Sequence, residues 1–204
     1  MSRIGVEAVA GKSSKQLYEA AIAARKNLGI PVDGRLICNM EQLLEKQLRL
    51  AYGVELDPRS DNDPELQGAL AAYNYSARVL KVRESVIYKL RIEDPDSLFT
   101  ISHEIGHIHL HSNPDLFRRE QPQLLPKAVC DPEKQADRFA REFMVDRRLL
   151  IEKYQNPNWA ANYFKIPINE IKILMSQLRQ EGVAGNSAAS RLDVYLDQQT
   201  DFDF

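Results

Sequence analysis

The sequence predicts an α+β domain that is mostly helical and contains a small antiparallel sheet. Three observations lead to this prediction. Apolar residues with helical spacing occupy both ends of the chain, a short stretch of alternating and β-branched residues (68–83) lies between them, and two Asp-Pro pairs mark helix starts. The length of 204 residues favours one main domain with small additions.

Two helices are expected before the alternating stretch. Residues 14–28 form an amphipathic pattern that stops before Gly29, and a second helix is expected over about 40–50 with Asn39 as its N-cap. Residues 57–64 are rich in turn-forming types and are expected to be a linker.

A hairpin and two longer helices are expected in the centre. Residues 68–74 and 78–83 are predicted to pair, with the turn near 75–77. One helix is expected to run from Pro95 to about His111 and the next from Pro132 to about Leu150, each with an aspartate as N-cap.

Two shorter helices, 159–164 and 169–180, have the spacing of a helix-turn-helix pair and stop at Gly182. The tail has four aspartates against one arginine and is expected to be disordered. We therefore divide the chain into an N-terminal helical segment with a flexible start (1–67), a core (68–150), a C-terminal helical subdomain (151–183) and an acidic tail (184–204).

The composition argues against several classes of protein. With a net charge of −2, the chain lacks the strongly basic character of proteins that mainly bind nucleic acid. There is no apolar run long enough for a membrane span, and residues 1–20 do not resemble a signal peptide. Two distant cysteines do not make a disulfide framework. These features predict a soluble cytoplasmic protein.

The four histidines all fall within residues 103–111, where His103-Glu104-Ile105-Gly106-His107 forms an HExxH motif. On a helix, two histidines four residues apart point within about 40° of each other and can hold one metal ion. Zinc suits imidazole ligands and keeps a position open for water, and Glu104 is placed to take a proton from that water. The alternative is a helix whose histidines are simply solvated.

A catalytic zinc usually takes a third protein ligand. The metzincin pattern is excluded, because Leu110 and Asn113 stand where it needs glycine and histidine. The remaining candidate is Glu133, which opens the next expected helix, with Asp137 one turn later placed to accept a hydrogen bond from a ligand histidine. The alternatives are a first-turn acid favoured by the helix dipole and an ordinary surface carboxylate.

Three segments in order resemble the ImmA/IrrE family of zinc metallopeptidases over about residues 68–182. They are 99–107 with His111 one turn on, 133–140, and 160–171 with Leu178. The resemblance implies a zincin-like, gluzincin-type core (68–150) with an edge strand above the active-site helix. It also implies one zinc ion per chain on His103, His107 and Glu133, with Glu104 as general base. Family members typically cut a helix-turn-helix repressor and so induce a mobile element or a stress response.

We therefore expect an intracellular zinc endopeptidase whose substrate pairs in extended form along 78–83. Tyr163 and His111 are candidates for lining the cleft or stabilising the oxyanion. Alternatively, His111 caps the end of its helix. The chain departs from the family where Met144 is followed by Val145 instead of proline. The alternative function is a non-proteolytic regulatory or toxin–antitoxin component that binds its partner. A transcription factor that uses the C-terminal helices is disfavoured by their charge balance.

Overall fold

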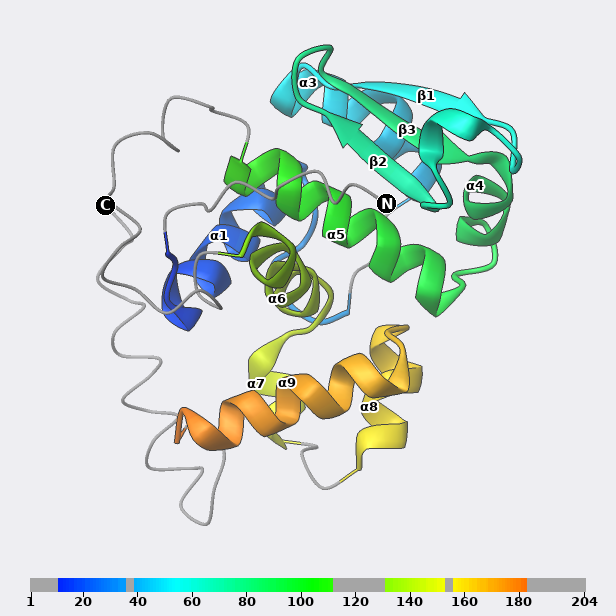
Figure 1. Cartoon of the computed structure of the whole chain (residues 1–204). Helices are drawn as coiled ribbons and strands as arrows, with labels where there is room; N and C mark the ends of the chain where they lie inside the picture. The colour runs from blue at the N-terminus through cyan, green and yellow to red at the C-terminus, as the bar shows by residue number, and fades with distance from the viewer. Residues whose placement is uncertain (1–10, 36–38, 112–130, 153–155, 183–204) are drawn as a thin grey trace.

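The computed structural model describes residues 11–35, 39–111, 131–152 and 156–182 (Figure 1). The expected flexible start, the loop between the two central helices and the acidic tail lie outside these ranges. The elements are α1 (Ser14–Asn27), α2 (Met40–Gln42), a π-helical turn η1 (Leu43–Gln47), α3 (Leu48–Tyr52), β1 (Glu55–Arg59), a 3-10 turn η2 (Pro64–Leu66), β2 (Ala71–Asn74), β3 (Val79–Arg83), α4 (Glu84–Leu90), α5 (Pro95–His111), α6 (Pro132–Met144), α7 (Arg147–Glu152), α8 (Pro157–Phe164) and α9 (Ile168–Gln180).

The fold is α+β, as predicted, and α5 runs through its middle (Figure 1). The small sheet lies on one side of α5 and α6 on the other, with α1 packed against α6. The predicted limits of α5 are confirmed, because Asp94 starts the helix by accepting a hydrogen bond from the backbone N–H of Ser97 at 2.9 Å.

The sheet has three strands in the order β1-β3-β2. The hairpin of β2 and β3 is confirmed, and Asn74 closes its turn by accepting the backbone N–H of Ala77 at 3.0 Å. The expectation of an antiparallel sheet is wrong for β1, which pairs with β3 in parallel and ends inside the segment expected to be a linker. Pro58 has no N–H to donate, which the edge position of β1 tolerates.

The strand order also corrects the expected substrate edge. Residues 78–83 contain β3, which has partners on both sides and so offers no free edge among the described strands. The open edge next to α5 belongs to β2. At this edge the backbone N–H of Tyr73 points away from β3 and towards α5, where it donates to Glu104 at 2.9 Å.

Helices α5 and α6 pack closely, and a glycine makes this possible. Ile101, Ile105 and Ile108 are fully buried in the core, on the face opposite to a set of polar side chains. A Cβ atom on Gly106 would lie 3.0 Å from the Phe139 ring and 3.2 Å from the Cα atom of Ala136. The glycine inside the HExxH motif therefore sets the distance between the two helices.

Helix α6 ends at Met144, six residues before its predicted end at Leu150. Val145 is extended, and Asp146 begins α7 by accepting the backbone N–H of Arg148 at 2.9 Å. Asp146 also accepts the N–H of Gly34 at 2.8 Å, while the buried Arg25 donates to the carbonyl of Phe143 at 2.6 Å. These contacts with distant segments stabilise the break between α6 and α7. No glycine or proline near Val145 marks it in the sequence.

Helices α8 and α9 match their predicted limits within two residues and pack against each other, and α9 also contacts α6. Within the described ranges, no helix is long and apolar enough to cross a bilayer.

Candidate metal centre

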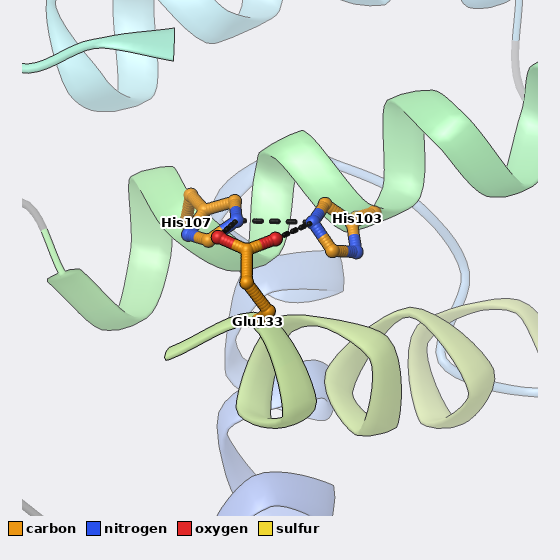
Figure 2. Close-up of side chains that lie close together, drawn as sticks. All are labelled: His103, His107 and Glu133. Atoms are coloured by element: carbon orange, nitrogen blue, oxygen red, sulfur yellow. Dashed lines mark hydrogen bonds and ion pairs between the residues drawn. The ribbon is translucent and has the colours of Figure 1, made fainter. Parts of the chain in front are cut away.

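Helices α5 and α6 bring His103, His107 and Glu133 together (Figure 2). The Nε2 atoms of the two histidines lie 3.0 Å apart. One oxygen of Glu133 lies 3.3 Å from Nε2 of His103, and the other lies 3.4 Å from Nε2 of His107. The three side chains thus converge from two helices on one point.

These distances fit a tetrahedral metal ion. With bonds of 2.0–2.1 Å to nitrogen and oxygen, the ligand atoms of a tetrahedral zinc site lie about 3.3–3.4 Å apart. Each histidine has one Glu133 oxygen at this spacing, a different oxygen for each, and the distance between the two Nε2 atoms is shorter by a few tenths of an ångström. The Glu133 side chain is 58% exposed, so the site is open on one side. The group can therefore bind a metal ion and leave a position for water.

His103 is held by carboxylates on both ring nitrogens. Its Nδ1 lies 2.9 Å from Asp137, one turn after Glu133 on α6. Burial lowers the pKa of His103, but the hydrogen bonds to Asp137 and Glu133 outweigh it and raise the pKa to about 9. The same hydrogen bonds from His103 and His107 hold the pKa of Glu133 well below its usual range. Without metal, His103 is therefore a cation between two anions, and a metal ion would displace the proton on Nε2.

His107 is held instead by a neutral chain. Its Nδ1 lies 3.3 Å from Nδ1 of His111, and Nε2 of His111 lies 3.2 Å from the amide oxygen of Gln135. Because the amide oxygen only accepts, His111 donates from Nε2 and accepts at Nδ1, which leaves the proton of His107 on Nδ1. Burial lowers the pKa of His111 to about 4, so His111 stays neutral. When a metal ion replaces the hydrogen bond from His107 to Glu133, this support keeps Nε2 of His107 pointed at the ion.

Glu104 lies beside the two histidines, and the residue is only 8% exposed. One of its oxygens accepts the backbone N–H of Tyr73 from the edge strand at 2.9 Å. Burial raises the pKa of Glu104, against the lowering effect of His107 and His103. A carboxylate with a raised pKa next to a metal centre suits a group that takes and returns a proton.

The sequence analysis missed two residues near this centre. The Tyr75 hydroxyl lies 3.3 Å from Nδ1 of His107, and burial, Glu104 and Glu133 raise the pKa of Tyr75. Gln135 is the second, as the acceptor for His111. Tyr73 and Tyr75 are two residues apart in a predicted hairpin, which is the signal that could have placed Tyr75 above the helix.

Tyr163, by contrast, is not brought to the centre. It stacks on Trp159 within α8, and its hydroxyl lies about 4.0 Å from where a Cβ atom on Gly34 would stand. The backbone N–H of Gly34 donates to Asp146, which follows the C-terminal end of α6, whereas Glu133 lies at its N-terminal end. The oxyanion role expected for Tyr163 therefore has no geometric basis, whereas His111 does lie in the centre, behind His107.

Comparison with known proteins gives a family match and structural similarity. A family model described as the IrrE N-terminal-like domain matches residues 67–175, which include every residue of the centre. The structure is also similar to a Mycobacterium tuberculosis transcriptional regulator, with a TM-score of 0.52 and 16% sequence identity. That match covers 76% of this chain and 45% of the regulator, so the chain spans less than half of the regulator's length. No curated protein matches the sequence significantly.

Proposed function

The chain belongs to the IrrE N-terminal-like family of peptidases, and from this premise we propose that it is a zinc-dependent endopeptidase that cuts a regulatory protein. The position of Glu104 carries the proposal. A site that only stores a metal needs the two histidines and Glu133, but it has no use for a buried carboxylate beside them.

The residues of the chain divide the work of peptide hydrolysis. His103, His107 and Glu133 would hold the zinc ion, which when bound supplies a Lewis acid that activates water and polarises the scissile carbonyl. Glu104 takes the proton from the attacking water as the new C–O bond forms. It then gives the proton to the amine nitrogen as the C–N bond breaks. The raised pKa of Glu104 favours the protonated form that this second step needs.

The substrate would pair along the open edge of β2, next to α5. The Tyr73 N–H that holds Glu104 in the free protein is also the donor that an extended peptide meets at this edge. Binding of a peptide carbonyl there would release Glu104 for proton transfer. Tyr75 stays protonated, because its pKa is raised, and is the hydroxyl donor nearest to His107 among the described residues.

The substrate class we propose is a helix-turn-helix repressor, which is the typical target in the family that the chain resembles. The similarity to a transcriptional regulator concerns the fold and says nothing about the target.

The test compares cells that make the wild-type protein with cells that make Glu104→Gln, by labelling new protein N-termini. We expect cleaved termini from a helix-turn-helix protein with wild type and a loss of at least about 100-fold with Glu104→Gln, because a general base contributes roughly 10²–10⁴ in rate. Both proteins should bind one zinc ion per chain. Equal cleavage by the two proteins would refute the mechanism. If Glu104→Gln restores the cellular function of the wild type although it cleaves no protein, the protein acts by binding its partner.

A further inference from the structure

A cavity lies beside the metal centre, lined by residues from the start of α1, from α6 and from α9. Figure 1 shows where these three helices lie. The volume of the cavity is about 390 Å³, within the size range of pockets that bind small molecules. Among the described residues, the walls carry side chains from α1 and the residue before its cap (Lys12, Ser14, Leu17), from α6 (Lys134, Gln135, Asp137, Arg141) and from α9 (Ile173, Gln177).

Positive charge dominates the cavity. Lys12 and Lys134 form no ion pair with any residue in the described ranges. Arg141 donates to Glu170 at 2.7 Å and lies 4.0 Å from Asp137, which in turn binds His103. Asp137 is the one carboxylate among the wall residues that the structure describes. Two lysines without a counter-ion on opposite walls leave a place for an anion with two charges.

The remaining walls restrict the ligand further. The side-chain oxygen of Gln177 is buried and receives no hydrogen bond from the described part of the chain. Such an acceptor is costly to bury without a donor, and a ligand hydroxyl would supply one once the Gln177 side chain turns into the cavity. Leu17 and Ile173 add a short apolar surface. A phosphate monoester with a neighbouring hydroxyl group meets all three conditions, since it carries close to two charges at pH 7.

The cavity also touches the supports of both metal-binding histidines. Asp137 bonds to His103, and Gln135 accepts from His111, which bonds to His107. We propose that this cavity binds a small hydroxylated phosphate monoester and that the ligand changes the metal affinity through Asp137 and Gln135. Binding itself does not depend on the proposed peptidase activity, whereas the coupling rests on the metal centre.

Calorimetry with glycerol 3-phosphate, on the metal-free and the zinc-loaded protein, tests the binding. We expect Lys12→Gln and Lys134→Gln each to weaken binding by roughly tenfold or more, since each removes one charge-assisted hydrogen bond. Lys15→Gln and Lys172→Gln are the matched controls, because these lysines lie on α1 and α9 outside the cavity wall. Gln177→Leu should remove the preference for glycerol 3-phosphate over inorganic phosphate. Glycerate, with a carboxylate in place of the phosphate, should bind more weakly.

Two results would overturn the binding. One is no binding at millimolar concentration, and the other is equal weakening by the cavity and control substitutions, which would mean general attraction of anions. The coupling is tested by chelator competition for zinc with and without glycerol 3-phosphate. A change of several-fold in wild type that disappears in Lys12→Gln supports it, and an unchanged zinc affinity with bound ligand refutes it. Neither readout uses peptide cleavage, so a failure of the proposed function is seen separately.

Discussion

Helix α6 places a carboxylate between two basic side chains near each of its ends, and the two arrangements behave in opposite ways. Near its start, Glu133 lies between His103 and His107, and its side chain is 58% exposed. Near its end, Glu142 lies between Arg138 and Arg147, and its side chain is completely buried. The same helix thus carries an open group of charges and a closed one.

The charged side chains of the closed group pair with one another and with nearby side chains of the protein. Arg138 donates to Glu142 at 2.7 Å and to Glu181 at 3.0 Å, and Arg147 forms a two-fold hydrogen bond with Glu142 while its guanidinium lies 4.4 Å above the Tyr18 ring. It therefore connects α1, α6 and the ends of α7 and α9. Since arginine does not lose its proton in proteins, no metal ion can replace it.

The open group differs because histidine can lose its proton. His103 and His107 can each present a neutral nitrogen, and the exposure of Glu133 gives an ion and a substrate access to the same point. Both groups pair opposite charges. They differ in burial and in the type of base, and these two properties distinguish a structural ion pair from a metal site.

Glu142→Ala should have the largest effect. It leaves two buried arginines with only the partly exposed Glu181 as a counter-ion, which costs about 3–5 kcal/mol in the free energy of unfolding. Urea unfolding of the metal-free protein measures this loss in the free energy of unfolding. Glu133→Ala, which removes the exposed carboxylate of the open group, is the control. Equal destabilisation by the two substitutions would show that the closed group is not a structural support.

Glu133→Ala should lower the zinc affinity by more than about 100-fold, because even residues that only orient a ligand contribute 10–100-fold. Glu84→Ala is the matched control, as Glu84 is also a first-turn acid, on α4, but is absent from the metal cluster of described residues. If Glu133 only complements a helix dipole, both variants will lose a few tenths of a kcal/mol in stability and zinc binding will not change. Chelator competition on the two purified variants distinguishes these outcomes.

The two supports of the histidines should differ in strength. Asp137→Ala removes a charged acceptor from His103, and we expect a loss of zinc affinity near the upper end of 10–100-fold. His111→Ala removes a neutral acceptor from His107, so we expect a loss near the lower end. The reverse order, measured by the same competition, would mean that the neutral chain is the more important support.

The stability of the metal-free protein should depend on pH through His103. The pKa of His103 is raised from 6.5 to about 9 by folding, so its contribution to stability is complete below pH 6.5 and is lost as the pH rises through about 9. Metal-free protein should therefore lose stability between pH 6.5 and 9. Thermal unfolding across this range measures the decline, and an equal decline in His103→Ala would exclude His103 as its source.

Part of the centre could be predicted from the sequence because it depends on local geometry. A four-residue spacing on a helix places His103 and His107 on one face, and Asp94-Pro95 marks where that helix begins. Glu133 was found by its place at the start of the next helix, and the structure does bring it to the histidines. Tyr73 on the edge strand and Tyr75 in the turn after it were not assigned, because local sequence does not determine which residue a hairpin places over a helix.

The sequence by itself determined helix α5, the capped start of α6 and the spacing of the HExxH motif, since hydrogen bonds within a helix join residues four apart and caps act within one turn. Only the tertiary structure decided three further features. These are the pairing of β1 with β3, the break between α6 and α7, and the choice of β2 as the open edge. Each depends on contacts between segments that lie far apart in the chain, such as the bond from Gly34 to Asp146. A residue's own neighbours do not encode such contacts, and they form only when the whole core is packed.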